Sequence, residues 1–204
     1  RFDEALALIK QAWQSDERFS YKGRFWQYDD IIVEPPTAQR PHPPIWIAAG
    51  STDSLKKVGR LGANLILDQF ASPAQSAERI GIYRASLMEH GHPFDPMNVA
   101  VARNFAVASS EAEQVAARQR AAAVHQRNIR LSARPDGANK SHIMAYADRP
   151  GATEEHALIG SPETIARQIE ALAKAGVSYI LLNGNADARR SIRPFAEKVM
   201  PLFR

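Results

Sequence analysis

The sequence predicts an α/β fold with a parallel sheet, because short apolar runs alternate with longer segments that carry apolar residues at helical spacing. Four such runs precede helical segments: 45–49, 64–68, 99–108 and 177–182. The chain has 204 residues, 45% of them hydrophobic, which is enough for a core and fits one domain, 1–204. In parallel α/β architectures, ligands bind at the carboxyl ends of the strands.

Composition argues against several classes of partner. The chain has no Cys, and its histidines show no helical pairing with carboxylates, so we expect neither disulfides nor a metal site. The net charge is +4, but no Lys/Arg run is interleaved with aromatic residues, so nucleic acid is not an expected partner. No run approaches the roughly 20 apolar residues of a membrane span, and no signal-peptide pattern is present. We therefore expect a cytoplasmic protein that does not enter the membrane.

The chain opens in a helical pattern whose apolar residues are Phe2, Leu6, Ile9 and Trp13. An aromatic and β-branched stretch, 19–34, follows around Lys22-Gly23 and predicts a β-hairpin or an extended excursion. Proline clusters at 35–36 and 41–44 then form a stiff connector to the first strand of the sheet.

That first strand ends in a turn of small residues, Gly50-Ser51-Thr52-Asp53-Ser54, which opens a helix. Such a turn presents backbone N–H groups and short hydroxyls, and this suits a phosphate. Gly50 lets the backbone approach a ligand closely, and Ser51, Thr52 or Ser54 can add a hydroxyl donor. The alternative is that Ser51 or Asp53 only caps the helix.

The later helices begin at clear start signals. Ser72-Pro73-Ala74-Gln75 and Ser110-Glu111-Ala112-Glu113 are capping boxes, the first with Pro at the first helical position. Gly160-Ser161-Pro162-Glu163 opens another helix, and Gly176 ends it. Between them, the stretch 131–157 has no clear period and is too long for a plain connection, so it predicts a lid or an insertion.

Five further side chains are candidates for ligand contact. Asp68 and Gln69 lie at the end of the second predicted strand, although Asp68 could instead cap the strand end or the next helix. Arg103 stands in an apolar strand and should either face the interior and its anion or pair with a carboxylate, with Asn104 on the opposite face. After the last strand, Arg190 and Arg193 either reach a phosphate or are solvated surface charges; we favour the second.

In this order, four segments resemble the C-terminal part of the bacterial luciferase-like flavin-dependent monooxygenases. They are RFDEAL at 1–6, FSYKGRFW at 19–26, PPIWIAAGS at 43–51, and the closing helix–strand–helix from Gly160 to Pro201. That family forms an eight-stranded (β/α) barrel of the TIM type. The resemblance implies that this chain supplies about four strands, its C-terminal half, with a hairpin and a lid insertion. The first four strands and the family's catalytic residues would lie outside it, so we name no catalytic residue and expect the chain to be catalytically incomplete.

The resemblance also implies cofactor contacts. It places the flavin phosphate at Gly50, Ser51 and Ser54, with Thr52 in the same turn, whereas the charge of Asp53 departs from the family pattern. Flavin-ring or substrate contacts fall at Asp68 and Gln69, and the sulfonate-desulfonating branch has an Arg placed similarly to Arg103. His142 and Tyr146, in the 131–157 insertion, would cover the mouth of the site, with a surface role as the alternative. In that position His142 and Tyr146 could touch the substrate, and substrate selection would lie in such lids and in the missing half.

The expected function is therefore that of a flavin-dependent oxidoreductase. The cofactor would be FMN, reduced by a flavin reductase and acting with O2 on a small-molecule substrate, or a deazaflavin coenzyme. A non-catalytic flavin- or nucleotide-binding α/β module or subunit is the alternative. Because a half barrel has two unpaired edges, we expect a homo-oligomer or association with the missing N-terminal half.

Overall fold

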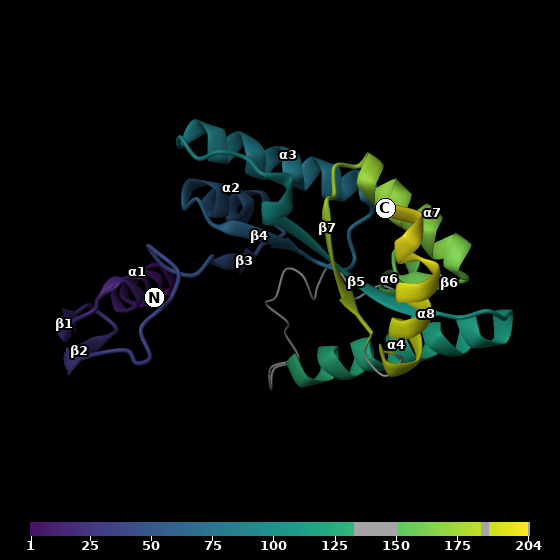
Figure 1. The fold of residues 1–204 in the computed structure, drawn as a ribbon, viewed down its shortest axis with the longest axis horizontal. Coiled ribbons are helices and arrows are strands. Elements are labelled where there is room, and N and C mark those ends of the chain that lie inside the picture. The colour runs from purple at the N-terminus through teal and green to yellow at the C-terminus, as the bar shows by residue number, and fades with distance from the viewer. Residues whose placement is uncertain (133–150, 185–187, 204) are drawn as a thin grey trace. The chain divides into compact units, whose positions relative to one another are not determined.

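The computed structural model describes residues 1–132, 151–184 and 188–203. Within them the chain forms two compact units, Arg1–Ile45 and Trp46–Arg204 (Figure 1). The assignment of 1–204 to one domain stays a prediction. None of the helices in the described ranges is long and apolar enough to cross a membrane.

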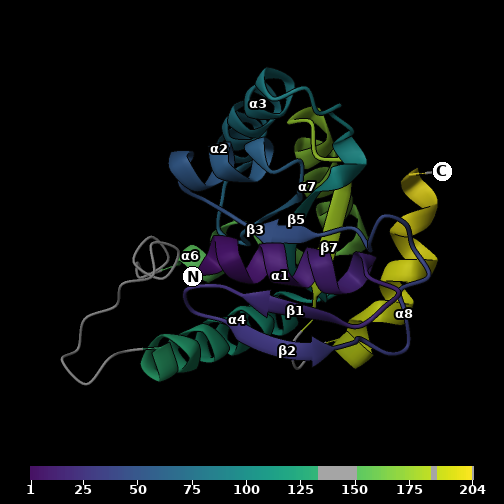
Figure 2. The same cartoon turned by 90° about the vertical axis from the view of Figure 1, so that its left-hand side faces the viewer.

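The first unit is a helix with a β-hairpin. Helix α1 (Phe2–Gln14) precedes strands β1 (Phe19–Lys22) and β2 (Gln27–Ile31), which pair antiparallel as the sequence predicted (Figure 2). Glu4 of α1 reaches the hairpin turn, where its Oε1 accepts hydrogen bonds from the amides of Phe25 at 2.8 Å and Trp26 at 2.9 Å. None of residues 1–45 is fully buried, so hydrogen bonds contribute much of what holds this unit together.

The second unit is built on a parallel sheet, which confirms the predicted fold class. Its neighbouring strands are β3 (Trp46–Ala48), β4 (Asn64–Leu67), β5 (Val99–Val107) and β7 (Tyr179–Asn183), in that order. The register places Ala48 beside Ile66, Ile66 beside Ala100, and Ala100 beside Tyr179. All four carboxyl ends therefore lie at one edge of the sheet.

One strand was missed. Strand β6 (Leu158–Gly160) pairs in parallel with the C-terminal end of β5, and the short helix α6 (Ala152–Glu155) precedes it. The predicted insertion at 131–157 falls mainly on 133–150, outside the described residues. Residues 131 and 132 of that segment continue α4, and residues 152–155 form α6, so these parts are helical rather than irregular.

Helices lie on both sides of the sheet. Helices α2 (Thr52–Arg60) and α3 (Pro73–Glu89) run side by side along one face, and α7 (Pro162–Lys174) continues that layer (Figures 1 and 2). The long α4 (Glu111–Ser132) crosses the other side. The 3₁₀ turn η1 (Pro96–Asn98) leads into β5, and α8 (Ala188–Lys198) packs on β5 before the closing turn η3 (Met200–Phe203). The predicted capping boxes at Ser72 and Ser110 are both formed.

Side-chain alternation separates two faces of the sheet. We call the covered face the one that packs on α2, α3 and α7; Leu65, Leu67, Val99 and Val101 point to it and are fully buried. The open face carries the alternate residues, including Ala48, Ile66 and Ala102. In a parallel α/β sheet, the functional question is what the open face presents at the carboxyl ends of its strands.

Candidate functional site

The turn between β3 and α2 forms a reciprocal cap. Ser51 is the N-cap of α2: its Oγ accepts from the Ser54 amide at 3.3 Å, and the Ser51 amide donates to the Ser54 Oγ at 3.1 Å. The Ser54 hydroxyl also donates to the Ser51 carbonyl at 2.8 Å. The capping alternative considered for Ser51 is thus the arrangement that the structure shows.

This cap leaves two helix amides pointing out of the N-terminus. Ser54 donates its amide to the cap and Leu55 donates to the Ser51 carbonyl, while the amides of Thr52 and Asp53, at the first two helical positions, have no acceptor within the helix. Together with Gly50 and the Ser51 hydroxyl, these amides give a geometry that fits a phosphate, because the helix dipole favours an anion there. Capping and phosphate binding are therefore compatible at this turn.

Asp68, at the end of β4, organises the following loop. Its Oδ1 accepts from the amides of Phe70 at 2.8 Å and Ala71 at 3.1 Å, and its Oδ2 forms an ion pair with Arg79 of α3 at 2.6 Å. Both side chains of the ion pair are largely buried. The structure thus shows Asp68 as a loop cap, which was one of the two alternatives. Gln69, next in the chain, lines the open face.

Arg103 lies on the covered face, so the first of its two predicted alternatives, a side chain that faces the interior and its anion, is not the arrangement in the structure. It is 1% exposed, and its guanidinium donates to three backbone carbonyls: Ala71 at 2.7 Å, Ala102 at 2.7 Å and Asp68 at 3.1 Å. Burial lowers the pKa of Arg103 to about 10, and the nearby charge of Asp68 partly offsets that effect. Arg103 thus holds the loop after β4 through hydrogen bonds made on the covered face. Its assignment as a cofactor ligand stays a prediction.

A hollow of about 270 Å³ opens on the open face at the ends of β3 and β4. Its wall is mainly apolar, and its polar members are Asp68, Gln69, His125 and Asn128. The last two come from α4, and the His125 ring contacts the Phe70 ring with centroids 5.0 Å apart. An apolar wall with a few convergent polar groups is typical of a small-molecule site.

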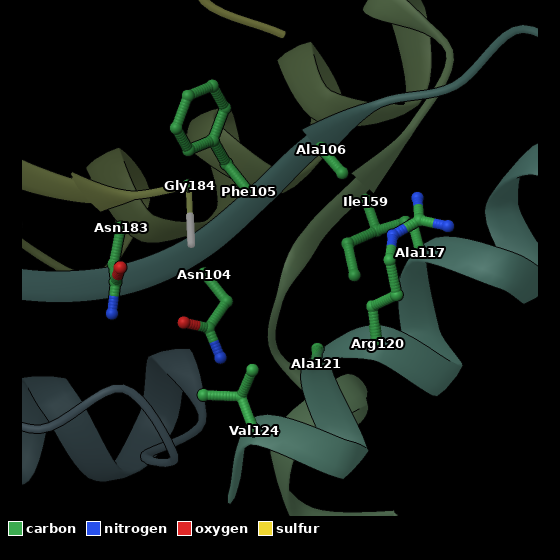
Figure 3. A pocket seen from close by; sticks show the side chains of 10 residues that line it. All are labelled: Asn104, Phe105, Ala106, Ala117, Arg120, Ala121, Val124, Ile159, Asn183 and Gly184. Carbon is green, nitrogen blue, oxygen red and sulfur yellow. The ribbon is translucent and has the colours of Figure 1, made fainter. Parts of the chain in front are cut away.

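A second, much smaller space lies beneath α4 at the ends of β5 and β7 (Figure 3). Asn104 and Asn183 are register partners, and Figure 3 shows both amides directed to the side on which Val124 of α4 lies. Asn104 is 4% exposed. As the sequence predicted, Asn104 points to the opposite face from Arg103.

The remaining predicted residues do not join the hollow. Arg190 and Arg193 are exposed on α8, and Arg190 lines a separate polar hollow that also includes Lys198. His142 and Tyr146 lie outside the described residues. Over 1–132, 151–184 and 188–203, no group of three or more His, Asp or Glu side chains is placed to hold a metal ion.

The sequence reasoning missed His125 as a site residue. The signal was available in the spacing, because Ala117, Ala121 and His125 follow one another at intervals of four on α4, and all three are buried. The two alanines line the small space at the end of β5, whereas His125 lines the hollow. The change from alanine to histidine therefore occurs where this face of α4 reaches the hollow.

Comparison with known proteins places this architecture in a family. A family model described as luciferase-like monooxygenase matches residues 1–179. The FMNH2-dependent dimethylsulfone monooxygenase of Pseudomonas putida is 25% identical over 222 residues, covering all of this chain and 58% of that protein. The oxygenase component of the flavin-dependent trigonelline monooxygenase of Acinetobacter baylyi is 28% identical over 120 residues, covering 58% of this chain and 33% of that protein.

Solved structures share the fold. The monooxygenase RslO1 of Streptomyces bottropensis matches all of this chain and 61% of its own with a TM-score of 0.71 and 21% identity. An F420-dependent secondary alcohol dehydrogenase matches 98% of this chain and 60% of its own with a TM-score of 0.72 and 20% identity. This chain thus spans 33% and 58% of the length of these two curated relatives and 61% and 60% of these two solved chains. On the family match, the chain belongs to the luciferase-like monooxygenases.

Proposed function

We propose that this chain forms the phosphate-binding turn and one wall of the site of a flavin-dependent oxidoreductase, an FMN-linked monooxygenase. The observation that carries the proposal is the pre-formed N-terminus of α2 at the same strand edge as the hollow. Two amides without a helical acceptor and the Ser51 hydroxyl converge there, while the hollow offers an apolar wall to a flat ring.

The residues of this chain would share the binding of FMN. Gly50, the Ser51 hydroxyl and the amides of Thr52 and Asp53 would hold the phosphate; Ser54 would keep Ser51 in place. The exposed Asp53 carboxylate must point away from that phosphate. The loop of Asp68 and Gln69 would bound the ring. When bound and reduced, FMN supplies electrons to O2, and the protein contributes orientation and exclusion of water.

Related proteins support this choice of cofactor. One relative is named as FMNH2-dependent, and the oxygenating constituent of 3,6-diketocamphane monooxygenase from Pseudomonas putida, solved with FMN, matches 98% of this chain with a TM-score of 0.69. Similar structures include F420-dependent enzymes, so a deazaflavin is the second candidate. An FMNH2-dependent reaction needs O2, a small-molecule substrate and a flavin reductase, and we propose that these meet in the cytoplasm.

The phosphate turn is tested with two flavins that differ only in the phosphate. Ser51→Ala and Ser54→Ala in the full chain should weaken FMN binding by about 1.5–3 kcal/mol, the value of a hydrogen bond to a charged group, and leave riboflavin binding almost unchanged. Fluorescence titration measures both affinities. Ser110→Ala is the matched control, because it removes the N-cap of α4 away from the turn. Equal weakening of both flavins would refute the phosphate assignment.

The competing proposal, a non-catalytic flavin-binding module, predicts tight flavin binding without turnover. Supplying FMNH2, O2, substrate and the rest of a family barrel should restore substrate turnover, beyond the oxygen uptake of free FMNH2, if the chain belongs to an oxygenase. Tight FMN binding with no turnover in the reconstituted pair would favour the module instead.

We also propose that the chain associates through its sheet edges. In the part of the sheet that the structure describes, β3 and β7 each pair with one neighbour, so each leaves backbone groups available to another strand. Sedimentation velocity should show a homo-oligomer, or a complex with the remainder of a barrel. A stable monomer at micromolar concentration would contradict this proposal.

A further inference from the structure

A second hollow, of about 90 Å³, lies on the covered face where residues of α6, β6 and α7 meet; we call it the α7 hollow. Leu158 of β6 and Leu172 of α7 give it apolar wall, whereas Arg103 of β5 and Gln168 of α7 bring polar side chains to it. One water needs only about 10–15 Å³ of such space, so the α7 hollow has room for several.

The Gln168 side chain is satisfied at one end only. Its Nε2 donates to the Ala157 carbonyl at 3.1 Å, and this bond fixes the orientation of the amide, because the opposite orientation would set two oxygens against each other. Its Oε1 is buried and has no hydrogen-bond partner among the residues described. A buried acceptor in this state is costly, so a donor is required beside it.

Arg103 has donors to spare on its buried guanidinium. That group carries five N–H bonds, and the carbonyls of Asp68, Ala71 and Ala102 accept three of them. The other two, on Nε and Nη2, have no acceptor within the part of the chain that the structure describes. The side chain is 1% exposed, so the place left for such an acceptor is the α7 hollow that it lines.

The wall of the α7 hollow favours a neutral occupant. A cation would lie beside the charge of Arg103, and an anion would meet the Glu155 carboxylate and the lone pairs of Gln168 Oε1. An apolar group would leave both polar side chains unsatisfied. Water accepts and donates hydrogen bonds at once, so it suits both.

We propose that the α7 hollow is a hydration site, in which ordered water accepts hydrogen bonds from Arg103 and donates one to Gln168 Oε1. The water joins α7 to the arginine that holds the loop after β4, so Gln168 is a positioning residue for the loop that carries Asp68 and Gln69. This site does not depend on the proposed function, because it concerns what supports the loop and not what the loop binds.

Gln168→Leu in the full chain tests the site by two measurements. Magnetic relaxation dispersion of water counts the molecules that stay bound longer than the protein takes to tumble, and the variant should hold fewer of them than the wild type. Hydrogen exchange at the amides of Phe70 and Ala71 should be roughly three- to tenfold faster, the size of one hydrogen bond, because their loop has lost part of its support. Gln119→Leu is the matched control: Gln119 is exposed on α4 and does not line the α7 hollow, so its loss should change neither measurement.

A crystal structure of the wild type gives a third measurement that does not require the variant to fold. It should show water within about 2.7–3.2 Å of both an Arg103 nitrogen and Gln168 Oε1. An anion or another side chain at that place would overturn the inference, as would an equal number of bound waters in Gln168→Leu and the wild type. If only residues of β6 exchange faster in Gln168→Leu, then Gln168 acts through its bond to Ala157 alone, and its positioning role is wrong.

Discussion

Replacing Arg103 tests how the loop after β4 is held. The Arg103→Met side chain has a similar length and removes the charge with all its donors. The Asp68 and Ala71 carbonyls then lose a buried partner. The third acceptor, the Ala102 carbonyl, belongs to strand β5 and is left out of the sum. An unsatisfied buried carbonyl costs about 1–2 kcal/mol, so we expect the free energy of unfolding to fall by about 3 kcal/mol. Arg103→Lys should lose about 2 kcal/mol, because one ammonium group lacks the planar fork that spans these carbonyls.

Urea unfolding followed by circular dichroism gives the stability, and hydrogen exchange gives the location of the change. The amides of Phe70 and Ala71 should exchange at least tenfold faster in Arg103→Met, since they are held by a loop that has lost its anchor. Arg167→Met is the control: this exposed arginine of α7 donates to Thr164 on its own helix, and its loss should change stability by less than about 0.5 kcal/mol. Wild-type stability, or a gain, in Arg103→Met would refute the reasoning by showing that desolvation of the charge outweighs its three hydrogen bonds.

Three other predictions concern Tyr83, Gly59 and Asp68, with Gly81 as the control for Gly59. Burial raises the pKa of Tyr83 to about 12, whereas an unfolded tyrosine titrates near 10. The free energy of unfolding, measured in urea titrations, should therefore fall as the pH rises from 10 to 12. Tyr83→Phe should lack this pH-dependent loss of stability. Gly59→Ala should cost about 1–3 kcal/mol, because its Cβ would lie 2.7 Å from a side chain and 2.9 Å from a carbonyl of α3, while Gly81→Ala, with nothing within 4 Å, should gain about 0.5–1 kcal/mol in thermal melts. Asp68→Asn breaks the pair with Arg79 and should weaken FMN and riboflavin by the same factor in fluorescence titrations, since it disturbs the ring wall and not the phosphate turn.

The elements that the sequence predicted well are those with local signals. The capping boxes at Ser72 and Ser110 need only residues three apart, and both formed. Strands β4 and β5 were predicted from apolar runs that are bounded by turn residues. Strand β6 did not, because three residues carry no period, and its existence depends on pairing with β5 more than fifty positions earlier in the chain. Non-local pairing of that kind has no local sequence signature.

The site shows the same limit. Alternation correctly placed Arg103 and Asn104 on opposite faces, but it cannot say which face the helices cover. That depends on the packing of α3 and α7, so a charged residue that looked like an interior anion ligand is instead bonded to three carbonyls on the covered face. His125 was overlooked for the converse reason, since its helix is Ala-rich and only the tertiary position of α4 sets that ring against Phe70 and the hollow.

The two walls proposed to hold the flavin are stabilised in different ways. The loop after β4 is fixed from the covered face by Arg103 and through its own carboxylate by Arg79, so Gln69 stands on a rigid support before any ligand arrives. The turn after β3 is held by hydrogen bonds between Ser51 and Ser54, which a phosphate can rearrange at little cost because each hydroxyl can rotate. Substitutions on the covered face should therefore weaken binding of the flavin ring although these side chains do not contact the ligand. Substitutions at Ser51 and Ser54 should weaken binding of the phosphate alone.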